Sequence, residues 1–200
     1  MKLIRIINGV LEENTYIVYD EKTLGGFLVD PGSDTERIAE AAQGIRLEAV
    51  LLTHGHFDHA MSAKAFQDKG IKIYIHAADA DKLCGRHNLS RYAGYKFDGL
   101  TADVLLSGGE TLDIAGFKVG VIHTPGHSRG GVCYFLRDYS ILFSGDTLFF
   151  EDIGRSDFYD GDYELLVKSI REKLFVLDGN TVVYPGHDES TAIEHERGRV

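Results

Sequence analysis

The sequence contains little cysteine, little proline and no tryptophan: two, three and none in 200 residues. Cys84 and Cys133 lie far apart, and neither has a second cysteine at the spacing of a metal clip. Cysteine therefore builds neither a disulfide framework nor a thiolate metal site here. Cys133, within GGVCYFL, is typical of a small buried apolar residue, and Cys84 is predicted to be a free surface thiol.

Long apolar runs and an excess of positive charge are also missing. No stretch reaches the roughly 18 apolar residues of a membrane span. Polar residues at positions 5, 8, 12 and 13 interrupt the N-terminal apolar run, unlike a signal peptide. The formal net charge of −10 repels a nucleic-acid backbone. We expect a cytoplasmic protein that acts on a small molecule, with no nucleic-acid or membrane partner; the oligomeric state stays open.

The composition, 44% hydrophobic and 26% charged, is that of a globular chain, and we expect one domain over residues 1–200. Segment 84–103 shows neither strand nor helix periodicity and is predicted to be a long loop or a loosely helical insertion, and loops of this length are often functional. The alternation of strands and helices favours an α/β fold of two sheets covered by helices. Strands are predicted at 3–7, 15–19, 26–30 (an antiparallel meander), 48–52, 72–75, TLDI, FKVGVIH, VCYFL, SILFSG and TVVYP, and helices at 33–43, 58–69, from about 77, at 163–174 and at the C-terminus.

Histidine is concentrated in three short segments that each follow a predicted strand, namely THGHFDH, TPGHS and YPGHD, and FSGDTLF places an aspartate in the same way. Loops at strand ends along one sheet edge converge, and imidazole with carboxylate suits zinc, iron or manganese. Seven ligands exceed the four of one tetrahedral ion and suit two ions about 3.5–4 Å apart. The predicted ligands are His54, His56, Asp58, His59, His127, Asp146 and His187.

A few residues outside these motifs are candidates for substrate contact. Arg155 carries a planar guanidinium that suits a substrate carboxylate, although we prefer a structural ion pair with Asp157 or Asp152. Aromatic residues in the 84–103 segment either line the mouth of the pocket or pack the loop against the protein. The weaker candidates in this segment are Tyr92, Tyr95 and Phe97, and His87 is a separate candidate for substrate contact.

The motifs THGHFDH, TPGHS, SGDTLF and PGHD, in this order, resemble those of the metallo-β-lactamase superfamily. Within it, GDTLFFEDIGRSDF is similar to the glyoxalase II (hydroxyacylglutathione hydrolase) group, in which GDTLF is followed by GR. The resemblance implies a four-layer αββα sandwich with the metals at one edge. It further implies the following ligand sets: His54, His56 and His127 for the first metal, Asp58, His59 and His187 for the second, and Asp146 for both.

Some features differ between branches of that superfamily. Position 56 is histidine where the flavodiiron branch has glutamate, and Asp146 stands where the true β-lactamases carry cysteine. Glyoxalase II enzymes add a C-terminal helical domain with glutathione contacts, whereas this chain ends thirteen residues after His187. We therefore expect a short form without that domain.

The expected activity is hydrolysis of a hydroxyacylglutathione-like thioester or a related small ester by a metal-bridging hydroxide, which Asp58 orients. The expected cofactors are two divalent ions, zinc first, with iron or manganese as alternatives. Two other activities stay open. A persulfide dioxygenase, which the GRSDF stretch also resembles, would use one iron on His54, His127 and Asp146. A lactonase or esterase would attack a ring or open ester.

Overall fold

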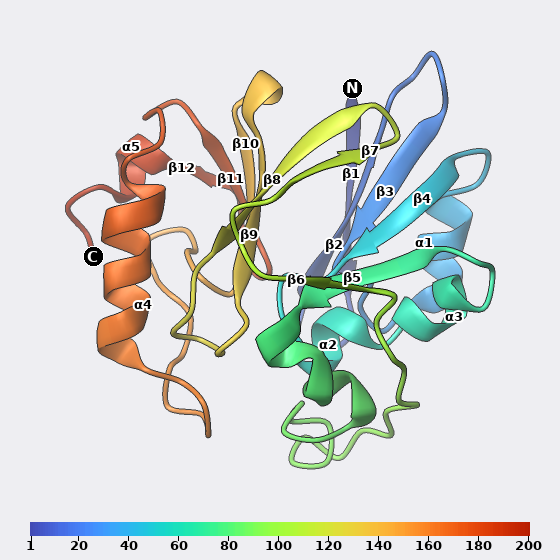
Figure 1. The fold of residues 1–200 in the computed structure, drawn as a ribbon, viewed down its shortest axis with the longest axis horizontal. Coiled ribbons are helices and arrows are strands. Elements are labelled where there is room, and N and C mark those ends of the chain that lie inside the picture. Colours follow the sequence, from blue (N-terminus) through green and yellow to red (C-terminus); the bar gives the residue numbers. More distant parts are fainter.

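A computed structural model describes residues 1–200 as two six-stranded sheets packed face to face, with helices on both outer surfaces (Figure 1). The sheet orders are β1-β2-β3-β4-β5-β6 and β12-β11-β10-β9-β8-β7. The strands are β1 (Lys2–Asn8), β2 (Glu13–Tyr19), β3 (Gly25–Val29), β4 (Arg46–Leu51), β5 (Lys72–His76), β6 (Val104–Leu106), β7 (Thr111–Ile114), β8 (Phe117–His123), β9 (Val132–Leu136), β10 (Ile141–Gly145), β11 (Val182–Pro185) and β12 (Thr191–Ala192).

Most helices are short and lie on the outer faces of the sheets (Figure 1). Asp34 caps the first helix by accepting a hydrogen bond from the Arg37 N–H, and Asp162 caps the fourth through the Leu165 N–H. None of the helices is long and apolar enough to cross a membrane. The helices are α1 (Thr35–Ala41), α2 (Phe57–Ala60), α3 (Ala63–Gln67), the 3₁₀ helices η1 (Ala77–Cys84) and η2 (Arg137–Tyr139), α4 (Tyr163–Ser169), its π-helical continuation η3 (Ile170–Leu174) and α5 (Ile193–Glu196).

Three apolar layers hold the two sheets and the helices together. Side chains alternate along each strand, so Tyr16 and Val18 of β2 face the second sheet while Ile17 faces the helices. The first sheet packs on α1, α2 and α3 through residues such as Ile38 and Phe66. The second sheet packs on α4 and η3, with Leu166 in the contact. The αββα arrangement expected from the sequence is confirmed.

The strand pattern expected from the sequence is also confirmed, including the antiparallel meander of β1, β2 and β3. The sequence missed β6, which has three residues and pairs in parallel with β5, and β12, which has two residues and pairs antiparallel with β11. The helix expected over 58–69 is wrong as one unit, because α2 ends at Ala60 and α3 begins at Ala63. Ser62 lies in the break, where its N–H donates to the Pro31 carbonyl at 3.0 Å and its hydroxyl to Gly32.

The two sheets are also joined by hydrogen bonds near the ends of β4 and β11. The Tyr134 hydroxyl donates to the Leu52 carbonyl at 2.7 Å, and the Tyr16 hydroxyl donates to the Pro185 carbonyl at 2.6 Å. The Val132 N–H donates to the Thr53 carbonyl at 2.8 Å. These contacts fix the loops that follow β4 and β11 relative to each other, and both loops carry predicted metal ligands.

The core between the sheets predicts a large effect for one aromatic residue. Phe143 is fully buried, with its ring centroid 5.2 Å from that of Tyr16 and 5.8 Å from that of Tyr184. We expect Phe143→Ala to lower the free energy of unfolding by about 3–5 kcal/mol, measured by urea denaturation. The half-exposed Phe150 is the control, and Phe150→Ala is expected to cost less than about 1 kcal/mol. Equal losses for the two variants would contradict this account of the core.

Candidate metal centre

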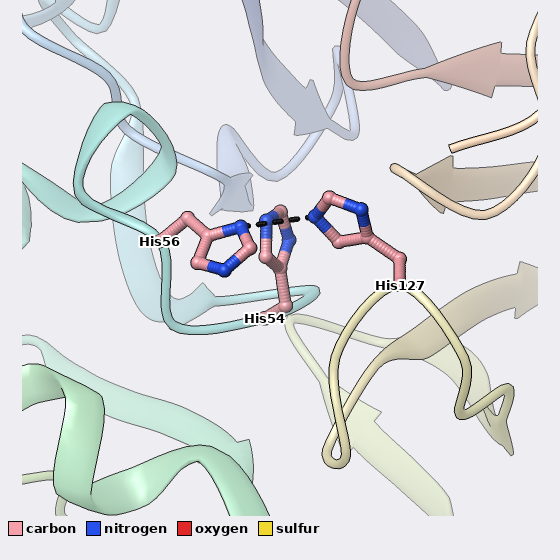
Figure 2. Close-up of side chains that lie close together, drawn as sticks. All are labelled: His54, His56 and His127. Atoms are coloured by element: carbon pink, nitrogen blue, oxygen red, sulfur yellow. Dashed lines mark hydrogen bonds between the residues drawn. The ribbon is translucent and has the colours of Figure 1, made fainter. Parts of the chain in front are cut away.

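The first group of predicted ligands lies where the loop after β4 meets the loop after β8. One nitrogen each of His54, His56 and His127 falls within a cluster whose atoms all lie within 4.8 Å of one another. Figure 2 shows that the three rings point toward one another, with His127 approaching from the opposite loop. His127 Nε2 lies 2.9 Å from His56 Nδ1. These residues fit the expected first metal position.

The second group lies beside the first. One ligand atom each of Asp58, His59 and His187 meets the same 4.8 Å criterion. Asp146 lies between the groups: its Oδ1 is 3.3 Å from His59 Nε2, and its Oδ2 is 3.6 Å from His127 Nε2 and 3.8 Å from His187 Nε2. The seven predicted ligands are therefore brought together, and Asp146 has the position that a bridging ligand needs.

Hydrogen bonds fix four of these imidazole rings through the nitrogen that faces away from the cluster. When Nδ1 carries the proton and donates it, the lone pair of Nε2 faces the cluster, as in the histidine ligands of metalloproteins. The Nδ1 acceptors are Thr53 Oγ1 for His54 (3.0 Å), Asp30 Oδ2 for His59 (3.0 Å), the Arg155 carbonyl for His127 (2.7 Å) and the Leu11 carbonyl for His187 (2.9 Å).

Several polar atoms of the cluster are buried without a hydrogen-bond partner. They include Nε2 of His54 and of His59, and Oδ1 of Asp146. An unpaired buried polar atom costs about 1–3 kcal/mol, so native proteins seldom leave several together. Imidazole nitrogens together with carboxylate oxygens are ligands that zinc, iron and manganese prefer. The residues present therefore fit two divalent ions.

Burial and neighbouring charges shift the pKa values of the predicted ligands in different directions. Burial lowers the pKa of His54 and His56 well below the ordinary histidine value, so both rings are neutral. Burial acts in the same direction on His59, but the carboxylates of Asp146 and Asp58 outweigh it and raise the His59 pKa. Burial alone would raise the pKa of Asp146, yet the charge on His59 holds it well below its ordinary value. Without an ion, a proton on His59 thus balances Asp146.

Asp30 supports the cluster, and the sequence analysis missed it. Its carboxylate accepts hydrogen bonds from the Thr53 N–H (2.7 Å), the Thr53 hydroxyl (2.6 Å) and His59 Nδ1 (3.0 Å). It is 1% exposed. Through Thr53 it also reaches His54, so one carboxylate orients a histidine in each group. The only signal in the sequence is an aspartate at a strand end, which turn formation before Pro31 explains equally well.

A second buried network braces the loops from the opposite side. Lys82 is fully buried and forms ion pairs with Asp79 at 2.7 Å and Asp160 at 2.5 Å. The Asp79 carboxylate accepts the N–H groups of Gly55 and Gly130 at 2.9 and 2.8 Å. Lys82 and Asp79 thus hold the turn between His54 and His56 against the loop after His127. Neither residue was singled out from the sequence, because a lysine in a helical segment is normally exposed.

A cleft of about 370 Å³ opens onto the cluster. Apolar side chains form much of its wall, and Arg155 is its one cationic residue. Arg155 pairs with both carboxylate oxygens of Asp157 at 3.0 Å and lies over the Phe158 ring at 4.5 Å, so the preferred ion pair is present. The lining residues are Leu11, His56, Phe57, Asp58, Leu89, Tyr92, Ala93, His127, Asp146, Phe149, Arg155, Phe158 and His187.

The aromatic candidates of the 84–103 segment and His87 have different positions, and Phe97 packs, partly buried, against the apolar layer between the first sheet and its helices. Tyr92 lines the cleft and is 93% exposed. Tyr95 lies outside the cleft and stacks on Phe57, with ring centroids 5.0 Å apart, so the structure gives it a packing contact. His87 stacks on Tyr159 at 4.4 Å and is also absent from the cleft wall.

The role of Asp30 yields a prediction for metal affinity. We expect Asp30→Asn to weaken metal binding by about 10–100-fold, because the imidazole of His59 loses its carboxylate partner. Competition with a chromophoric chelator measures the affinity. The control is Asp103→Asn, which removes a carboxylate that accepts hydrogen bonds from Ile73 and Gln67 away from the cluster. Unchanged affinity in Asp30→Asn would refute the supporting role.

Three comparisons place the chain among known proteins. Hydroxyacylglutathione hydrolase GloC of Haemophilus influenzae is 32% identical over 93% of this chain and 90% of its own. The crystal structure of BLEG-1 B3 metallo-β-lactamase is 35% identical, covers 98% of this chain and 96% of its own, and superposes with a TM-score of 0.92. The crystal structure of TTHA1623 in a di-iron-bound form is 32% identical over 98% of each chain, with a TM-score of 0.87.

The family model described as the metallo-β-lactamase superfamily matches residues 8–187. This range contains all seven predicted ligands, Asp30, and both networks that hold the loops. Members of this superfamily bind divalent metal ions, and the donor set described above fits them. The chain therefore belongs to the metallo-β-lactamase superfamily of metallo-hydrolases.

Proposed function

We propose that this protein hydrolyses thioesters of a small acyl group, with two divalent ions held by His54, His56, Asp58, His59, His127, Asp146 and His187. The observation that carries the proposal is the position of Asp146 between two histidine clusters that face a partly apolar cleft. A two-metal arrangement is typical of hydrolases. The similarity to a relative named hydroxyacylglutathione hydrolase supports a thioester as the substrate.

Bound divalent ions supply Lewis acidity, which activates water at neutral pH and polarises a carbonyl group. The protein supplies position. His54 and His59 are held by Thr53 and Asp30, so their Nε2 donors do not reorient during turnover. Phe149 and Phe158 line the cleft, where they exclude bulk water and strengthen electrostatic contacts with the reacting carbonyl.

Asp58 is the residue placed to orient the attacking water. It lines the cleft, and its Oδ2 lies 3.5 Å from His187 Nε2 and 3.8 Å from His59 Nε2. Its side chain is 16% exposed, whereas those of His54 and His59 are almost completely buried. A carboxylate oxygen in that position accepts a hydrogen bond from water and directs the water's lone pair toward a carbonyl in the cleft.

The test combines metal analysis with a substrate panel. The purified protein is expected to hold close to two metal ions per chain by elemental analysis and to cleave S-lactoylglutathione, with activity lost on chelation and restored by metal. The panel includes a lactone and a small aryl ester. It also includes a β-lactam, because the BLEG-1 structure bears the name of a B3 metallo-β-lactamase. Preferential cleavage of any of these over thioesters would replace the proposed substrate class.

The main alternative is oxidation of a persulfide with molecular oxygen by a single iron. One observation favours it: the GRSDF stretch, which resembles that of persulfide dioxygenases, lies against the cluster. The Arg155 carbonyl of this stretch accepts a hydrogen bond from His127 Nδ1. The iron ligands would be His54, His127 and Asp146, the 2-His-1-carboxylate set of oxygen-using iron sites. One iron per chain with oxygen uptake on glutathione persulfide, and no thioester cleavage, would establish this alternative.

Asp58 provides the sharpest kinetic prediction. We expect Asp58→Asn to lower kcat for the thioester by about 100-fold or more, because asparagine cannot accept and transfer the proton of water. KM is expected to change less than about threefold, since Asp58 contributes little to holding the acyl group. Metal content measured alongside separates this effect from metal loss, which Asp146→Ala is expected to cause. A fully metallated variant with normal kcat would refute the role of Asp58.

A further inference from the structure

A second hollow of about 510 Å³ lies beside the catalytic cleft. The two share Leu89 and Tyr92 in their linings, so they lie next to each other. His87, in the wall of the second hollow, stacks on Tyr159 with nearly parallel rings, which joins this wall to the segment that carries Phe158. The complete lining is Cys84, Gly85, Arg86, His87, Asn88, Leu89, Arg91 and Tyr92. All of these residues belong to the η1 end or to the loop expected to be functional.

The charge of the second hollow is opposite to that of the whole chain. The chain has a formal net charge of −10, yet no aspartate or glutamate lines this hollow. Arg86 and Arg91 both line it, and neither side chain donates a hydrogen bond, pairs with a carboxylate or lies over an aromatic ring. By contrast, Arg129 pairs with Asp81 and Asp160, and Arg155 pairs with Asp157. Two free guanidinium groups at one hollow form a site for anionic oxygens.

We propose that the hollow lined by Arg86 and Arg91 binds the anionic part of the substrate's thiol carrier, while the acyl group lies in the catalytic cleft. The inference rests on the proposed thioester hydrolysis. In a thioester, the carbonyl carbon joins the acyl chain to the sulfur of the carrier. When this carbonyl lies beside the metal ligands, the carrier extends past Leu89 and Tyr92. The anionic oxygens belong to carboxylates, as in glutathione, or to phosphates, as in coenzyme A.

The kinetic test compares one acyl group on three carriers: glutathione, coenzyme A and the neutral N-acetylcysteamine. The wild type is expected to prefer a charged carrier in kcat/KM. Each of Arg86→Ala and Arg91→Ala is expected to lower the ratio of charged to neutral carrier by about fivefold, the scale of one exposed ion pair. Preference for glutathione identifies carboxylate recognition, and preference for coenzyme A identifies phosphate recognition. Equal use of all three carriers by the wild type would overturn the proposal.

The matched control is Lys96→Ala. Lys96 lies in the same loop, is highly exposed and is not part of either hollow. Its replacement removes one positive charge, as each arginine variant does, and is expected to leave the carrier ratio unchanged. If Lys96→Ala lowers the ratio as much as Arg86→Ala, the preference comes from overall charge and not from this hollow, and the proposal is wrong.

A second measurement does not depend on activity. Cys84 is exposed and lines the hollow, whereas Cys133 is buried, so neutral iodoacetamide reports on Cys84 alone. Saturating S-methylglutathione or desulfo-coenzyme A is expected to slow alkylation of the wild type severalfold, and to protect the Arg86→Ala, Arg91→Ala double variant much less. If neither ligand protects Cys84, the subsite is refuted. If no thioester is cleaved but Cys84 is protected, the proposed hydrolysis fails and the anion site stands.

Discussion

The burial of unpaired donor atoms at the joined edge of the two sheets is the constraint on which the rest of the structure depends. Nε2 of His54 and of His59 and Oδ1 of Asp146 are removed from water and make no hydrogen bond, although His59 Nε2 and Asp146 Oδ1 lie 3.3 Å apart. Such an arrangement is unfavourable in a chain that binds no cation. Divalent ions offset this cost, so metal binding and the stability of the folded loops are coupled in the same free energy.

The surrounding residues orient the rings that carry those donors. Asp30 holds His59 and Thr53, and Thr53 holds His54, which fixes two rings through their outer nitrogens. The Lys82 network then ties the loop after β4 to the loop after β8. Buried ion pairs contribute little net stability but penalise every alternative in which one partner is left alone. Two buried charged residues outside the ligand set, Asp30 and Lys82, therefore hold the loops at this edge in place.

The same arrangement of sheets and loops places the candidate metal ligands and the outer wall of the cleft on different segments of the chain. The loops after β4, β8, β10 and β11, together with α2, carry the candidate metal ligands, whereas the segment after η1 contributes Leu89, Tyr92 and Ala93 to the cleft wall and carries the two unpaired arginines beside it. Loops vary without disturbing the three apolar layers, since none of those layers requires the exposed side chains of the 84–103 segment. The strand ends thus bring the candidate metal ligands together, and under the proposed function the loop recognises the carrier.

The sequence by itself determined ten of the twelve strands, the four motifs and the identity of the seven candidate ligands, because alternation and short-range spacing are local properties of the chain. It did not show that α2 and α3 are separate, since the Ser62 N–H turns to Pro31, thirty-one positions away. It could not single out Asp30 or Lys82, because Asp30 meets Thr53 and His59 from 23 and 29 residues away and Lys82 meets Asp160 from 78 residues away. Nor could it show that Tyr92 lines the cleft whereas Tyr95 stacks on Phe57. Those outcomes depend on which segments meet in space, and only the packing of the two sheets decided that.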